Sequence, residues 1–146
     1  MKKIKVLFVG TGNSARSQMG EALLRRHAGN RVEACSAGLE PEGIHPYTKR
    51  ALKEIGINLA GQYSKDLDQY KGKSTFGYLI TVCAEAKEKC PADFPGIAVH
   101  LHWPFENLTA FAGTEEEKLE RFREVRDQID LRLRSWLQEQ GISIEE

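Results

Sequence analysis

Phe8-Val9-Gly10-Thr11-Gly12-Asn13-Ser14-Ala15-Arg16-Ser17 joins a strand end, a glycine-rich turn and a helix start. The apolar run from Ile4 to Val9 before it is typical of a strand buried on both faces. The pattern after it predicts a helix from about Ala15 to His27. A strand that ends in glycines and passes directly into a helix indicates an α/β unit.

The rest of the chain continues this alternation of strands and helices. Further strands are expected at 32–36, 78–82 and 97–102, and further helices at 45–56 and 114–141. The second of these helices begins with Thr114 and three glutamates, which form a capping box. The alternation predicts one domain, residues 1–146, with a three-layer α/β/α architecture around a four-stranded, mainly parallel sheet.

The bulk composition excludes several classes of partner. Lys+Arg and Asp+Glu are equal at 21 each, so no broad basic field indicates binding to nucleic acid or to an anionic membrane. No apolar run approaches the roughly 20 residues of a membrane span, and the N-terminus lacks the pattern of a signal peptide. The 3 cysteines, in a chain without an export signal, predict a reducing, cytoplasmic setting in which thiols are more often catalytic or metal-binding than structural.

The turn after the first strand has the chemistry of an oxyanion-binding loop. Successive backbone N–H groups can point inward as a nest, and the helix N-terminus adds partial positive charge. Arg16 can place two N–H groups on two oxygens of a tetrahedral anion. The pattern is neither a Walker loop nor a dinucleotide fingerprint, and a plain glycine-rich turn is the alternative. The predicted oxyanion-binding residues are Thr11, Gly12, Asn13, Ser14, Ala15, Arg16 and Ser17.

This loop resembles the Cys-x5-Arg signature of low-molecular-weight tyrosine phosphatases and of the thioredoxin-coupled arsenate reductases built on their fold. Further stretches resemble the reductases in order over essentially the whole chain. They are Ser36-Ala37-Gly38, 79–83, Cys90-Pro91, His102-Trp103 and 122–129, in addition to 11–19. The resemblance implies a phosphatase-like fold and the binding of arsenate, phosphate or sulfate in the loop.

In that family a loop thiolate attacks the oxyanion, and the resemblance places it at position 10. Gly10 has no side chain, so the first covalent step has no nucleophile. Loss of the nucleophile from a covalent mechanism costs on the order of a millionfold in rate. The backbone N–H groups of the loop do not depend on that side chain. We expect Ser14 and Ser17 to support the loop around position 10. The sequence therefore predicts anion binding with absent or very low activity.

A second part of the resemblance concerns Cys83 and Cys90. In the reductases, the second cysteine of the relay attacks the loop sulfur and releases arsenite. The third then attacks the second, and the resulting redox-active disulfide is reduced by thioredoxin. Two alternatives stay open: the cysteines are unrelated, or they join His100 and His102 in a zinc site. Cys35 is expected to be a small buried hydrophobe.

The segment after the fourth strand departs from the family a second time. Where family members carry an aspartate followed by proline as general acid, this chain has Asn107-Leu108. An amide can donate a hydrogen bond but cannot deliver a proton at neutral pH. The adjacent Glu106 is a candidate substitute, although neighbouring side chains usually point in different directions.

Some reductases of this type hold a potassium ion beside the loop. The matching positions are Asn13, Glu21, Ser36 and Asp66, whose oxygen atoms suit a hard cation. The alternative is that Glu21 is a solvated helix residue and Asn13 a turn former. No other cofactor is expected.

Three functional hypotheses follow. The first is a thioredoxin-linked arsenate reductase that lacks its loop nucleophile. The second is a phosphatase-like protein, which is disfavoured because both the nucleophile and the acid are missing. The third is a non-catalytic oxyanion-binding module, or a redox sensor that uses only Cys83 and Cys90.

Overall fold

A single parallel sheet forms the centre of the protein. The computed structural model describes residues 3–59, 61–70, 75–82, 97–108 and 111–144. The strands are β1 (Ile4–Gly10), β2 (Val32–Gly38), β3 (Phe76–Thr81) and β4 (Ile97–His102). Their order is β2-β1-β3-β4, and all three pairings are parallel. The predicted α/β class with a four-stranded parallel sheet is confirmed.

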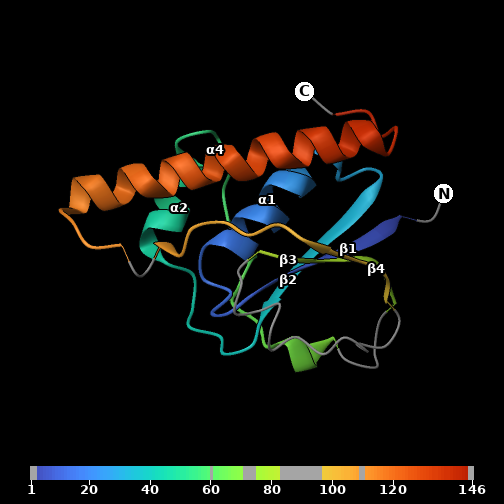
Figure 1. Ribbon diagram of the computed structural model, residues 1–146, viewed down its shortest axis with the longest axis horizontal. Helices are drawn as coiled ribbons and strands as arrows, with labels where there is room; N and C mark the ends of the chain where they lie inside the picture. The colour runs from blue at the N-terminus through green and yellow to red at the C-terminus, as the bar shows by residue number, and fades with distance from the viewer. Residues whose placement is uncertain (1–2, 60, 71–74, 83–96, 109–110, 145–146) are drawn as a thin grey trace.

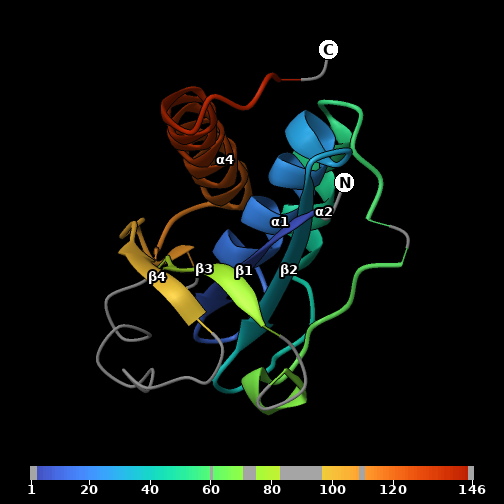
Figure 2. The same ribbon diagram turned by 90° about the vertical axis from the view of Figure 1, so that its right-hand side faces the viewer.

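Three helices lie on one face of this sheet (Figures 1 and 2). They are α1 (Arg16–Ala28), α2 (Pro46–Lys53) and the long α4 (Glu115–Glu139). The described part of the opposite face carries a short 3-10 helix, η1 (Leu67–Gln69), which the sequence did not predict. The segment 83–96, where the connection between β3 and β4 runs, lies outside the described residues.

The central strand β1 explains why its sequence is a continuous apolar run. Val6 and Phe8 are fully buried in the core shared with α1 and α4. Leu7 and Val9 are equally buried on the other face, where Leu67 of η1 packs against them. Because both faces are covered, no polar alternation is possible, and the prediction of a strand buried on both faces is confirmed.

Local signals set most helix ends. The predicted capping box of α4 is present: the N–H of Glu117 donates to Thr114 Oγ1 at 3.1 Å, and the N–H of Thr114 donates to Glu117 Oε1 at 3.1 Å. Helix α2 ends at Lys53, earlier than predicted, because the chain turns after it and reaches Gly56 with φ +84°. No helix in the described part of the chain is long and apolar enough to cross a membrane.

The N-terminus of α2 is capped by a histidine that also touches the loop after β1. His45 Nδ1 accepts the N–H of Tyr47 at 3.0 Å, and the N–H of His45 donates to the carbonyl of Ser14 at 3.0 Å. The ring lies 4.8 Å from that of Phe122, centroid to centroid. Burial lowers the pKa of His45, and the nearby charge of Lys118 lowers it further. The neutral ring is therefore the form that caps α2.

Stability should consequently depend on the protonation of His45. The unfolded chain takes up this proton near a pKa of about 6.5. The folded protein resists it, so this part of the stability is present above that pH and is lost as the pH falls. His45→Asn keeps a capping acceptor that does not titrate. We expect the variant to lose less free energy of unfolding than the parent on acidification from neutral pH, measured by urea denaturation. Equal losses would contradict this.

Candidate functional site

The loop between β1 and α1 turns its carbonyl groups outward. Each carbonyl from position 10 to position 14 accepts a hydrogen bond from outside the loop. The donors are the N–H groups of Leu39, Glu40, Glu42 and His45, the hydroxyls of Ser64 and Thr48, and the side-chain amide of Gln18. In a trans peptide the N–H points opposite to the carbonyl, so the N–H groups of residues 11–15 face the concave side. This is the geometry of an anion-binding nest.

The concave side encloses a cavity of about 140 Å³. Its walls are residues 10–17 together with Glu42, Asn107 and Leu108. Helix α1 begins at this cavity, and its N-cap residue, Ala15, makes no side-chain capping bond. The first turn of α1 also lacks an acidic residue, so no side-chain carboxylate there offsets the partial positive charge of the helix end.

Asn13 fixes the shape of the loop. It is 1% exposed, and its φ of 49° places it in the left-handed region that asparagine tolerates. Its Nδ2 donates to Ser17 Oγ at 2.8 Å, while its Oδ1 accepts from Gln18 Nε2 and from the N–H of Lys65, both at 2.8 Å. All three contacts are buried. Asn13 is therefore a buried support of the loop and more than a turn former.

Position 10 has room for a small side chain. A Cβ on Gly10 would lie 3.1 Å from Ser17 Oγ and 3.6 Å from Val82 Cγ2. The backbone of Gly10 is outside the left-handed region, so an L residue meets no strain there. Only the Ser17 hydroxyl must move by a few tenths of an ångström. A group at this position would lie beside that hydroxyl, as expected from the sequence.

The segment after β4 brings two further residues to the cavity. Its backbone is tied to the end of β3, because the N–H of Phe105 donates to the carbonyl of Val82 at 3.0 Å. The carbonyl of Phe105 in turn accepts a hydrogen bond from Arg16 Nη1 at 3.0 Å, which holds the guanidinium at the cavity wall. Asn107 lines the same cavity. The structure thus brings together the loop, Arg16 and the residue at the predicted general-acid position.

The carboxylate that lines the cavity is Glu42 and not Glu106, the candidate substitute for the general acid. Glu106 forms an ion pair with Arg121 of α4 at 3.1 Å and is not among the lining residues. Glu42 lines the cavity instead; a Cβ on Gly12 would lie 2.9 Å from its Cδ atom. Glu42 was not singled out from the sequence, because no motif marks it and it lies far from the loop along the chain.

The four residues expected to hold potassium all have partners within the chain. Ser36 Oγ donates to Glu21 Oε1 at 2.6 Å, and Lys65 Nζ lies 3.5 Å from the same oxygen. Asp66 Oδ1 accepts the N–H of Asp68 and caps η1. The alternative in which Glu21 is a solvated helix residue is wrong, because it is 4% exposed.

The cysteine pair of the predicted relay, Cys83 and Cys90, lies outside the described residues. His102 Nδ1 is hydrogen-bonded to Thr81 Oγ1 at 2.7 Å. The described part of the chain contains no cluster of three His, Cys, Asp or Glu side chains that could hold a metal ion. Cys35 is only half-buried, and burial and the charge of Glu33 are among the causes that raise the pKa of its thiol.

Comparison with known proteins identifies the family. The profile of the low molecular weight phosphotyrosine protein phosphatases matches residues 5–144. The chain belongs to this family. An arsenate reductase from Halalkalibacterium halodurans is 38% identical over 136 residues, which cover 93% of this chain and 96% of that protein.

Solved structures of arsenate reductases also resemble this chain. An arsenate reductase in its phosphate-binding state superposes with a TM-score of 0.76 at 27% identity, covering 93% of this chain and 98% of that one. A thioredoxin-dependent arsenate reductase from Corynebacterium glutamicum gives a TM-score of 0.70 at 30% identity, covering 94% of this chain and 61% of that one. Within the phosphatase family, the chain therefore groups with the arsenate reductases.

Two paired glycines offer a test of the loop geometry. Gly10 and Gly38 are partners in the β1–β2 ladder. A Cβ on Gly38 would lie 2.8 Å from the backbone N of Asn13 and 2.8 Å from the carbonyl O of Thr11. Gly38→Ala must therefore push the loop away, at a cost of about 1–3 kcal/mol. Gly10→Ala meets only the Ser17 hydroxyl. We expect Gly38→Ala to weaken phosphate binding, measured by calorimetry, at least about tenfold more than Gly10→Ala. Equal effects would contradict this geometry.

Proposed function

We propose that this chain is an arsenate reductase of the thioredoxin-coupled type that binds arsenate, phosphate or sulfate in the loop 10–17 but lacks the thiol for the first chemical step. The observation that carries the proposal is the nest of inward N–H groups around a cavity that Arg16 also lines. Membership in the phosphatase family and 38% identity to an arsenate reductase support the choice of substrate.

Binding needs no group that this chain lacks. The inward N–H groups and the N-terminus of α1 present partial positive charge, and the guanidinium of Arg16 adds a full charge with a forked set of donors. The carbonyl of Phe105 engages Nη1 of Arg16, which limits the rotamers of this long side chain. The amide of Asn107 can donate to a bound oxygen but cannot protonate a leaving group.

The chemical steps depend on a thiol at position 10. With cysteine there, the thiolate would attack As(V) and displace one oxygen as water. Cys83 would then attack that sulfur; the S–As bond breaks, its electron pair stays on arsenic, and arsenite leaves. Cys90 would attack Cys83 to give the Cys83–Cys90 disulfide and free the loop thiol. A thioredoxin dithiol would reduce this disulfide, supplying the two electrons.

Gly10 stops this sequence before the S–As bond forms. Cys83 and Cys90 could still exchange with thioredoxin in a reducing cytoplasm, without arsenate turnover. The protein is therefore expected to bind the anion and to turn it over slowly or not at all.

Arg16 should determine anion affinity. Arg16→Lys keeps the charge but loses the forked donor set and the bond to Phe105. A hydrogen bond to a charged group contributes about 1.5–3 kcal/mol, so we expect phosphate and arsenate binding to weaken about 10- to 100-fold by calorimetry. The control is Arg31→Lys, an exposed arginine that does not line the cavity. An unchanged affinity in Arg16→Lys would contradict the binding site.

Restoring the sulfur should restore the reaction. We expect Gly10→Cys, assayed with arsenate, thioredoxin, thioredoxin reductase and NADPH, to oxidise NADPH, and the parent and Gly10→Ser to remain near background. The gap can reach on the order of a millionfold if the remaining machinery is intact. Adding Cys83→Ser to Gly10→Cys should abolish turnover, because arsenite release needs the second thiol.

Other outcomes of this assay favour other functions. Activity in the unmodified chain would mean that a different thiol, such as Cys83, makes the first attack. Hydrolysis of an aryl phosphate by Gly10→Cys, undiminished by Cys83→Ser, would indicate a phosphatase. If Gly10→Cys remains silent even with Asn107→Asp added, the non-catalytic oxyanion-binding or redox-sensing module becomes the better description.

A further inference from the structure

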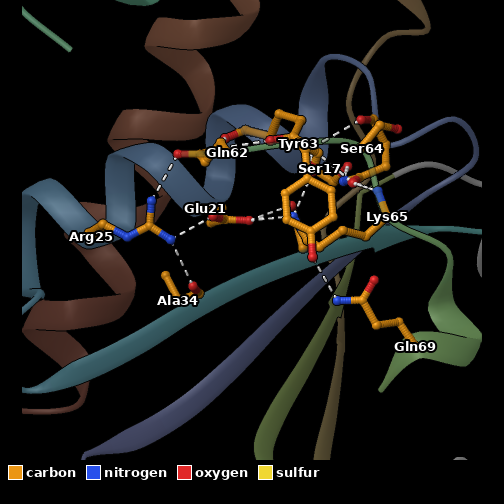
Figure 3. Close-up of polar contacts among 12 residues, drawn as sticks. Ser17, Glu21, Arg25, Ala34, Gln62, Tyr63, Ser64, Lys65 and Gln69 are labelled. Atoms are coloured by element: carbon orange, nitrogen blue, oxygen red, sulfur yellow. Dashed lines mark hydrogen bonds and ion pairs between the residues drawn. The ribbon is translucent and has the colours of Figure 1, made fainter. Parts of the chain in front are cut away.

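A buried ion cluster lies directly behind the anion-binding loop, between α1, β2 and the segment 62–66 (Figure 3). Its charged members, Glu21 and Lys65, are only 4% and 5% exposed. Lys65 Nζ lies 3.5 Å from Glu21 Oε1 and donates to the carbonyl of Tyr63 at 2.7 Å. The ammonium also lies 4.7 Å from the centre of the Tyr63 ring, a cation–π distance.

The carboxylate of Glu21 is fully engaged by groups of this chain. Oε1 accepts the Ser36 hydroxyl at 2.6 Å in addition to its contact with Lys65. Oε2 pairs with Arg25 Nη2 at 2.5 Å, and the same guanidinium donates to the carbonyl of Ala34 (Figure 3). Burying a carboxylate without a cation is costly, and the ammonium and the guanidinium offset this cost at Glu21.

The backbone of Lys65 ties this cluster to the loop. Its N–H donates to Asn13 Oδ1 at 2.8 Å, and its carbonyl accepts the N–H of Gly38 at 2.8 Å. The side-chain amide of Gln18 donates both to Asn13 Oδ1 and to the Tyr63 carbonyl. The residue that brings the cation therefore also holds the asparagine that fixes the loop.

The oxygen atoms expected to bind potassium do not form an ion site in this arrangement. Asn13 Oδ1 already accepts two hydrogen bonds, which use both of its lone pairs. Asp66 Oδ1 caps η1. The third and fourth ligands, on Glu21 and Ser36, face the ammonium of Lys65 or each other. The residues present do not fit a potassium ion alongside Lys65.

We propose that the ammonium of Lys65 is a built-in cation that replaces a monovalent metal ion behind the anion-binding loop, neutralising Glu21 and holding the segment that supports Asn13. Lys65 is a positioning residue, because it acts through Asn13 and does not line the cavity. The inference concerns the support of the loop and holds whether or not arsenate is reduced there.

Two substitutions with different volumes test this. Lys65→Ala removes the ammonium and its stem, leaving space beside Glu21 Oε1, Ser36 Oγ and the Tyr63 carbonyl, all hard oxygen ligands suited to potassium. Lys65→Met removes the charge but keeps most of the stem, so no ion can enter. The exposed Lys53→Ala makes the same change of net charge on the surface and serves as the control.

The measurement is the thermal unfolding midpoint in potassium, ammonium or choline chloride at one ionic strength. We expect potassium and ammonium to raise the midpoint of Lys65→Ala above its value in choline, and to leave the parent, Lys65→Met and Lys53→Ala unchanged. Phosphate affinity of Lys65→Ala in choline should fall about tenfold and recover in potassium. Residues that position the ligands of metal sites change affinity or activity about 10- to 100-fold, and Lys65 supports the loop in the same indirect way. Only this affinity readout rests on the proposed function.

Two results of the thermal measurement would overturn the proposal. One is a potassium-specific rise in the parent, which would mean that an ion binds beside Lys65. The other is a Lys65→Ala protein that responds to neither cation, which would make the ammonium a packing group only.

A double variant covers the case in which Lys65→Ala does not fold. Lys65→Met with Glu21→Gln removes both charges, and we expect it to be more stable than Lys65→Met alone. If the double variant is no more stable, Lys65 does not neutralise Glu21 and the proposal fails.

Discussion

The loop after β1 keeps its shape because each carbonyl that the turn directs outward accepts a hydrogen bond from a neighbouring segment. The peptide groups after Gly10 lie beyond the β1–β2 ladder and before α1, and an unpaired buried carbonyl would be costly. The donors come from the chain after β2, from the start of α2, from the segment 62–66 and, for the Asn13 carbonyl, from Gln18 of α1. The shape of this loop thus depends on the whole carboxyl edge of the sheet, where these segments come together.

This constraint explains which features the sequence could predict. The apolar run of β1 and the capping box at Thr114 are local patterns, and each forms as expected. The glycine-rich turn after β1 is also a local pattern, and its carbonyl groups point outward as an anion-binding nest would require. The carboxyl ends of parallel strands meet at one edge, so the loop and the segment around Asn107 could be expected to face one cavity. The sequence could therefore predict which local segments line this cavity, and the binding role of those segments stays a prediction.

The remaining features depend on contacts between distant parts of the chain. Asn13 and Lys65 are far apart in sequence, and nothing in either residue type indicates that they bond. The Phe105 carbonyl that holds Arg16 is a backbone group, so it leaves no trace in the side-chain pattern. Glu42 lies at the cavity because its own N–H donates to the Gly12 carbonyl. Such contacts follow from strand order and register.

The site separates into parts with independent physical supports. The concave side of the loop 10–17 is formed by main-chain N–H groups and by Arg16. Neither depends on a side chain at position 10. The rear support of the loop depends on the charge balance around Glu21, where Lys65 and Arg25 supply positive charge from within the chain. Replacing a thiol by Gly10 removes the nucleophile without removing a contact that holds the loop, since the backbone there needs no special conformation. Loss of the chemical step and retention of the loop geometry are therefore compatible in this fold, because the side chain at position 10 is needed only for the first.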